Sequence, residues 1–285
     1  MTIYVNGCSH TIGVSNKYSW SYIIGNSISR KINYIVGNNQ KKYYEEVDYG
    51  TNQNNLYNFS DSAKGNDTIF YETLEFLSKC KLNNFKPNYV FIQWSGPNRI
   101  ARQDVFENMI FNTPGDDADV IFEPHASRTS LSYIFCLQEI LKSMDIEYYF
   151  CCYMDFDKKC QQYPMFDSIE LDKFISFDNT SHPILDGFRN MMRKKYLALD
   201  GAGHPSYLGH YFIANKFLEK INIDSVGFFE LLPSLNEVYP PNIVKKPFDF
   251  VDYYTDTMID KSDINNSKLR EGTESEKNNI RKTIF

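Results

Sequence analysis

Residues 3–13 read IYVNGCSHTIG, an alternating apolar run that stops at Gly7 and is followed closely by Ser9. This pattern predicts a buried strand that enters a tight turn and presents Ser9 at the carboxyl end of the strand. In open α/β sheets, ligands bind outside the carboxyl ends of the strands. Ser9 is therefore a candidate nucleophile, and a distant stretch, DGAGHPS, supplies a candidate base, His204, with Asp200 to orient it.

Composition narrows the class of protein. The chain has 285 residues with 42% hydrophobic residues, enough for one large domain or one domain with an appendage. A net charge of −6 and scattered basic residues argue against a nucleic-acid-binding face. No apolar run is long enough to span a membrane, and the first residues lack the features of a signal peptide, so we expect a protein made in the cytoplasm.

Cysteine and histidine usage gives no sign of a metal or cofactor. The six cysteines form no metal-type Cys-x-x-Cys pair, and the adjacent Cys151 and Cys152 lie in an apolar run that is typical of core cysteines. We expect all six to be reduced thiols. With only five histidines in the chain, we predict no metal site.

Strand and helix patterns alternate along the first 222 residues. We expect strands near 1–7, 56–60, 89–94 and 147–154, and helices near 20–32, 68–79, 131–144, 185–199 and 206–221. Asn66 and Asp67 are expected to cap the second helix, and longer irregular excursions are expected at 33–54, 99–129 and 155–184. This order predicts a three-layer αβα fold around a flavodoxin-like parallel sheet.

The chain is expected to divide near residue 222. Residues 1–222 would form the α/β domain, and residues 223–285 a C-terminal extension. From Lys261 onward the sequence is charged and polar, which predicts disorder or an arm that a protein partner orders.

Four short blocks occur in order, three of them after predicted strands or at their ends: GCSHTIG at 7–13, NFSDSAKGND at 58–67, WSGPNR at 94–99 and DGAGHPS at 200–206. Together they resemble the SGNH (GDSL-like) hydrolase family, which is named for a serine, a glycine, an asparagine and a histidine. The resemblance covers roughly residues 1–222. It implies a serine esterase that needs neither a cofactor nor a metal.

The first and fourth blocks carry the implied catalytic residues. Ser9 falls on the family's serine, with Cys8 where the family has an aspartate, and its backbone N–H would join the oxyanion hole. His204 falls on the family's base and Asp200 on the residue that orients it, although their spacing is one residue longer than in the family. From the residues alone, Ser9 fits a helix cap equally well.

The second and third blocks carry the rest of the implied oxyanion hole. Ala63 stands where the family has a glycine that donates its backbone N–H, and Gly65 and Gly50 are alternatives. Asn98 would donate its side-chain N–H, and Arg99 replaces the family's last aspartate. The alternative for Asn98 is an ordinary turn residue beside a proline.

Two other histidines are interpreted as structural. Neighbours across a strand-to-helix turn point in different directions, so His10 is expected to face away from Ser9. His210 is expected to be partly buried in the last helix.

The resemblance leaves several functions open. The favoured one is an O-deacetylase that acts on acetylated carbohydrate, because the aromatic-rich excursions can stack on sugars. The short first block, the Trp-Ser-x-Pro block and the richness in Asn, Lys and Tyr resemble SGNH-like proteins that bacteriophages often encode. This resemblance implies a host glycan substrate or association with the virion. The first alternative is a catalytically inactive structural or binding protein whose C-terminal arm docks on a protein partner. A nucleotide-binding flavodoxin-like module is disfavoured, because the first turn lacks a glycine-rich phosphate loop.

Overall fold

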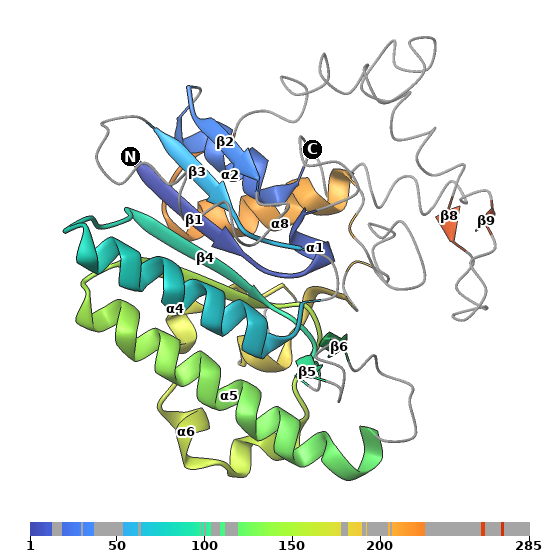
Figure 1. Cartoon of the computed structure of the whole chain (residues 1–285). Helices are drawn as coiled ribbons and strands as arrows, with labels where there is room; N and C mark the ends of the chain where they lie inside the picture. Colours follow the sequence, from blue (N-terminus) through green and yellow to red (C-terminus); the bar gives the residue numbers. More distant parts are fainter. Residues whose placement is uncertain are drawn as a thin grey trace.

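The architecture is seen in a computed structural model (Figure 1). The residues that the structure describes are 1–12, 19–29, 31–36, 54–61, 64–97, 99, 101–103, 109–111, 119–177, 182–189, 192, 205, 207–225, 258–259 and 269–270.

The centre of the fold is a sheet of five parallel strands in the order β2-β3-β1-β4-β7 (Figure 1). The strands are β1 (Thr2–Asn6), β2 (Asn33–Val36), β3 (Asn55–Asn58), β4 (Tyr89–Trp94) and β7 (Glu147–Cys152). The strand β1 is central, since Val5 pairs with Asn58 of β3 and with Phe91 of β4. Without β2, the remaining four strands follow the flavodoxin-like order.

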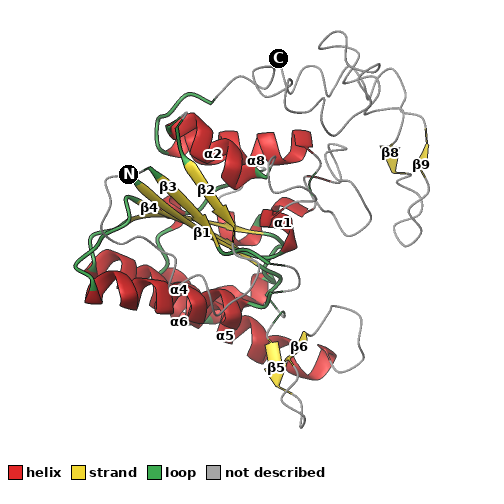
Figure 2. Ribbon diagram, turned by 45° about the horizontal axis from the view of Figure 1, so that its top comes forward, coloured by secondary structure: helices red, strands yellow, loops and turns green. Residues whose placement is uncertain are grey.

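Helices cover both faces of the sheet (Figure 2). The helices α2 (Trp20–Ile28) and α8 (Tyr207–Lys220) pack together on one face, and α4 (Asn66–Leu82) and α5 (Asp119–Ser143) pack together on the other. A short helix, α1 (Ser9–Ile12), follows β1 at the carboxyl edge of the sheet. The predicted three-layer α/β fold is therefore confirmed.

Alternating residues of the central strand β1 pack into two separate hydrophobic cores, one on each face of the sheet. Ile3 and Val5 pack with α2 and α8, where the Trp20 ring stacks on Phe217 at a centroid distance of 4.8 Å. Tyr4 points to the opposite face and packs with α4 and α5. Burial on both faces explains why these strands read as continuous apolar runs in the sequence.

The irregular excursions contain more regular structure than the sequence predicts. The edge strand β2 lies at the start of the polar region 33–54, where no strand was expected, because its pairing with β3 compensates for a weak local pattern. A short antiparallel hairpin, β5 (Ala101–Gln103) with β6 (Met109–Phe111), lies within 99–129.

Two helical predictions need a correction or stay open. Helix α5 begins at Asp119, well before the predicted start at Leu131, so the last part of the excursion expected at 99–129 is helical. Short helical turns occupy part of 155–184, namely η2 (Lys158–Gln162), α6 (Pro164–Asp167), η3 (Leu171–Lys173) and η4 (Pro183–Leu185). Most of the helix expected at 185–199 lies outside the described residues.

Beyond α8, the described residues are few. Residues 221–225 follow the helix, and the two-residue strands β8 (Met258–Ile259) and β9 (Leu269–Arg270) pair with each other. The expectation of an arm over 223–285 otherwise falls outside the described residues. No helix among those that the structure describes is long and apolar enough to cross a membrane.

The cysteines belong to the core rather than to a reactive site. All six thiols are free, and all but Cys136 are buried. Burial raises the pKa of Cys80 to about 12 and raises the pKa of Cys151 well above its ordinary value, with Cys152 and Cys8 as smaller causes for Cys151. These two thiols therefore stay protonated and act as small apolar side chains.

Candidate active site

Ser9 lies at the carboxyl edge of the sheet, on the loop that joins the central strand β1 to α1. This loop is tight because a Cβ atom on Gly7 would lie 2.1 Å from Oγ1 of Thr11. That Thr11 hydroxyl donates to Oε1 of Gln93, on the neighbouring strand β4, at 2.7 Å. Only a glycine therefore fits at position 7, where α1 approaches the end of β1. Ser9, two residues later, is partly exposed.

The Ser9 hydroxyl contacts the side chain of the next residue, His10. Nδ1 of His10 lies 3.4 Å from Oγ of Ser9 and 3.3 Å from Sγ of Cys8. The expectation that His10 faces away from Ser9 is therefore wrong, because both residues lie in the first turn of α1 and Tyr153 packs against the imidazole. A distance of 3.4 Å is long for an O–H···N bond, so this contact with His10 is a weak one.

An aromatic wall borders this serine on the side of β7. The ring of Tyr153 lies against His10 with a centroid distance of 3.5 Å and an interplanar angle of 31°. Phe188 packs on Tyr153 at 5.6 Å, and the next residue, Arg189, donates its backbone N–H to the carbonyl of Tyr153 at 2.9 Å. The wall therefore combines the end of β7 with a segment distant from it in the sequence.

Asn66 fixes the turn that follows β4. Its Oδ1 accepts the N–H of Ser95 at 2.8 Å, and its Nδ2 donates to the carbonyl of Gly96 at 3.0 Å and to Oγ of Ser130 at 2.9 Å. The sequence predicts a helix cap here, but the N-cap of α4 is Gly65, which makes no side-chain cap bond. Asn66 instead ties the start of α4 to the turn that follows β4.

A buried ion pair fixes the loop that follows β3. Nζ of Lys64 lies 2.5 Å from Oε2 of Glu72 and also donates to the carbonyl of Phe59. Asn6, at the end of β1, donates to the same Glu72 oxygen at 3.1 Å. The side chains of Lys64 and Glu72 are 5% and 12% exposed, so this pair joins the loop, α4 and the central strand inside the fold.

His210 has the structural role that the sequence predicts. It is 2% exposed, and its Nδ1 accepts the backbone N–H of Trp20 at 3.2 Å. The imidazole therefore joins α8 to the first turn of α2, and this nitrogen is not available as a base.

Of the residues that the sequence assigns to catalysis, the structure describes Ser9, whereas four lie outside the described residues: Ala63, Asn98, Asp200 and His204. The alternative Gly50 also lies outside them, and Gly65 is the N-cap of α4. The structure therefore brings together the loops around Ser9 without testing the proposed triad or the complete oxyanion hole.

Sequence reasoning did not single out three polar or aromatic residues of this edge: Lys64, Tyr153 and Arg189. Tyr153 had a signal, because it lies within the predicted strand near its carboxyl end. Lys64 and Arg189 had none, since a lysine in a loop and an arginine in a predicted helix are common on any surface.

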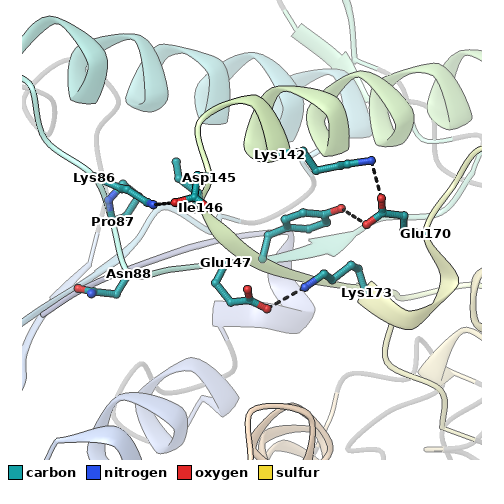
Figure 3. Close-up of a pocket in the computed structure, with 10 residues that line it drawn as sticks. Lys86, Pro87, Asn88, Lys142, Asp145, Ile146, Glu147, Glu170 and Lys173 are labelled. Atoms are coloured by element: carbon teal, nitrogen blue, oxygen red, sulfur yellow. Dashed lines mark hydrogen bonds and ion pairs between the residues drawn. The ribbon is translucent and has the colours of Figure 1, made fainter.

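A hollow of about 560 Å³ lies at the opposite, amino-terminal edge of the sheet (Figure 3). Each of its three lysines is bound to a carboxylate, at N···O distances of 2.6 Å for Lys86–Asp145, 2.5 Å for Lys142–Glu170 and 2.8 Å for Lys173–Glu147. The Tyr148 hydroxyl donates to Glu170 at 3.1 Å, and burial together with that carboxylate raises the pKa of Tyr148. These charges neutralise one another within the fold.

The chain matches no protein-family model and no curated protein sequence. Among the residues that the structure describes, no three histidine, cysteine or acidic side chains are grouped as a metal site would require. A functional assignment must therefore be argued from the geometry of the carboxyl edge.

Proposed function

We propose that this chain is a serine esterase of SGNH type that removes O-acetyl groups from carbohydrate. The observation that carries the proposal is the position of Ser9, which begins helix α1 directly after the central strand of a parallel sheet. Ligands bind at this edge in open α/β sheets. The backbone N–H of Ser9, at the first position of α1, would then join the oxyanion hole.

In the proposed reaction, His204 takes the proton of Ser9 as the serine oxygen attacks the acetyl carbonyl. The tetrahedral oxyanion is held by N–H groups of Ser9, Ala63 and Asn98, and Asp200 orients the imidazole. His204 then returns the proton to the departing sugar oxygen, and water releases acetate from the serine ester through the same steps.

Fixed neighbours of the implied donors support this assignment. The backbone N–H of Asp61, before Ala63, donates to the carbonyl of Gly7 at 3.3 Å. The carbonyl of Pro97, before Asn98, accepts from Ser130 at 2.7 Å. An anchored loop limits the positions that a donor on it can take, which favours oxyanion stabilisation.

The test is hydrolysis of p-nitrophenyl acetate by the wild type and by Ser9→Ala and His204→Ala. Each substitution should lower kcat by at least about a thousandfold, because a nucleophile and its base act as a unit. Ser143→Ala is the matched control, since its exposed hydroxyl donates only to the carbonyl of Ile140 in its own helix. Circular dichroism checks that every variant is folded.

His10→Gln completes the test, because the nearest imidazole to Ser9 in the described structure is that of His10. Loss of turnover in His10→Gln with full activity in His204→Ala would assign the base to His10 instead. Equal rates in folded wild type and Ser9→Ala would overturn the esterase proposal.

A binding protein that keeps this fold without its chemistry is the second candidate. Its support is Cys8, which stands where the family has an aspartate and is completely buried. The Cys8 thiol contacts Oε1 of Gln93 at 3.4 Å and the imidazole of His10, so it packs within the fold. A folded, inert wild type would favour this candidate.

A further inference from the structure

Arg189, which has no carboxylate partner among the described residues, is linked to the candidate nucleophile through two rings. The Cζ atom of Arg189 is 5.8 Å from the centroid of the Tyr153 ring, and its NH1 is 3.8 Å from Sδ of Met154. The same Tyr153 ring packs on His10, whose Nδ1 contacts the Ser9 hydroxyl. A continuous series of contacts therefore runs from Ser9 through two rings to the guanidinium.

The charge of Arg189 is not neutralised by the described part of the fold. Arg189 forms no ion pair with any residue that the structure describes, and its buried Nε has no hydrogen-bond partner there. Asp155 and Asp186, in the adjoining loops, have other partners. Asp155 accepts the N–H of Gly187 at 2.8 Å, and Asp186 accepts from Ser176 and from the N–H of Phe177, both at 2.9 Å.

Burying the Nε of Arg189 without a hydrogen-bond partner costs free energy. A buried donor without an acceptor loses its hydration and gains nothing in return. A bound ligand that supplies negatively charged oxygens would remove this cost and would gain charge-assisted hydrogen bonds.

A second arginine lies at the end of the neighbouring strand. NH1 of Arg99 is 3.4 Å from Oγ of Ser95, and Arg99 likewise forms no ion pair with the residues described around it. The two loops are in contact, because Sδ of Met154 lies 3.0 Å from the position that a Cβ on Gly96 would occupy. Two cations therefore border the ends of adjacent strands in a chain whose net charge is −6.

We propose that Arg189, stacked on Tyr153 and assisted by Arg99, binds a carboxylate of the substrate, so that the ester cleaved at Ser9 belongs to an acidic sugar. This inference rests on the proposed function and names its substrate class. A planar guanidinium matches the two oxygens of a carboxylate, and the buried Tyr153 ring beneath it holds the guanidinium in place. A phosphate is the poorer match, because the loop after β1 lacks the glycine-rich run of N–H groups that cradles phosphates.

The test compares two chromogenic esters that differ in one charge: p-nitrophenyl acetate and the same ester with a carboxylate on its ring, ortho to the nitro group. The wild type should prefer the carboxylated ester by about tenfold in kcat/KM. Arg189→Gln should abolish this preference, because kcat/KM for the carboxylated ester should fall by about tenfold relative to that for the neutral ester. Arg189→Lys should keep part of the preference, since it retains the charge but not the planar fork.

Lys173→Gln is the matched control for the loss of one positive charge. Nζ of Lys173 also lies over two tyrosine rings, 5.4 Å from the centroid of Tyr148 and 5.1 Å from that of Tyr149. These tyrosines lie near the start of β7, at the amino-terminal edge of the sheet and not at the edge where Arg189 lies. The ratio of kcat/KM for the carboxylated ester to that for the neutral ester should be the same in Lys173→Gln as in the wild type. Arg99→Gln provides a second variant at the proposed subsite, with a smaller expected loss of about threefold.

A wild type without preference, or an Arg189→Gln that loses both esters equally while folded, would overturn the subsite. If neither ester is hydrolysed, the esterase proposal fails, and binding of D-glucuronate to the full-length protein decides the subsite by itself. Weakening of that binding by about tenfold or more in Arg189→Gln would support it. No binding of D-glucuronate, equal binding by both proteins, or tighter binding of inorganic phosphate would overturn it.

Discussion

The two edges of the sheet both carry cations, but the fold neutralises them in different ways. At the amino-terminal edge, each lysine of the hollow has a carboxylate within hydrogen-bond distance (Figure 3). At the carboxyl edge, Lys64 has a buried partner, whereas Arg99 and Arg189 have no carboxylate partner among the described residues. A cation that is matched within the fold contributes to folding, and one left unmatched near a candidate nucleophile can bind a ligand.

The matched pairs at the two edges also differ in burial. Lys64 and Glu72 have side chains that are 5% and 12% exposed, whereas those of Lys86 and Asp145 are 50% and 98% exposed. Water screens the exposed pair, so breaking it costs little. Breaking the buried pair leaves an uncompensated charge inside the protein.

The largest expected effect on stability is therefore that of Lys64→Met. This substitution leaves the Glu72 carboxylate buried without its cation, and the free energy of unfolding should fall by about 3 kcal/mol. Urea denaturation at neutral pH measures the change. Replacing both Lys64 and Glu72 with methionine should restore part of the loss, because no buried charge then remains.

The exposed pair provides the comparison for this experiment. Lys86→Met should leave the urea midpoint close to that of the wild type, because Asp145 is almost fully hydrated. Equal losses at the two edges would show that burial does not distinguish the two pairs.

Asn66→Ala should have the next largest effect, because Asn66 joins the start of α4 to the turn after β4. Loss of its side chain leaves the N–H of Ser95 buried without an acceptor, which should cost about 2 kcal/mol. If the turn holds an oxyanion donor, kcat for p-nitrophenyl acetate should fall by roughly tenfold to a hundredfold with little change in KM.

Asn83→Ala is the matched control at the other end of the same helix. Its exposed side chain donates to the carbonyl of Lys79 within the helix, 2.8 Å away. This variant should leave kcat unchanged. A fall in kcat that is equal in the two variants would mean that Asn66 acts through general helix stability rather than through the turn.

The sequence predicts the sheet and the place of Ser9 because both depend on local patterns. The apolar residues at 3–5 and 90–92 are buried on both sides, and a glycine marks where the first strand turns. The roles of Asn66 and Lys64 depend on partners that local patterns do not reveal. Asn66 bonds to Ser130, 64 residues away, so the local sequence predicts only a helix cap.

The smallest expected effect concerns Lys173 and Glu147 at the amino-terminal edge. Burial of Glu147 opposes its ionisation, but hydrogen bonds from Lys173 and Tyr149 and the charge of Lys173 outweigh it and lower the pKa of Glu147. The folded state thus releases this proton at a lower pH than the unfolded chain does. The resulting stability is present above the pKa of the unfolded glutamate and is lost as the pH falls through the folded pKa.

Lys173→Gln should therefore be less stable than the wild type at pH 7 by only about 0.5 kcal/mol, since both side chains are partly exposed. The difference should shrink below about pH 4, as Glu147 becomes protonated in both states of the wild type. Urea denaturation of the two proteins between about pH 7 and pH 3 measures this convergence. A difference that persists undiminished at about pH 3 would assign the effect to packing of Lys173 on the Tyr148 and Tyr149 rings, because that contact does not depend on the glutamate's charge.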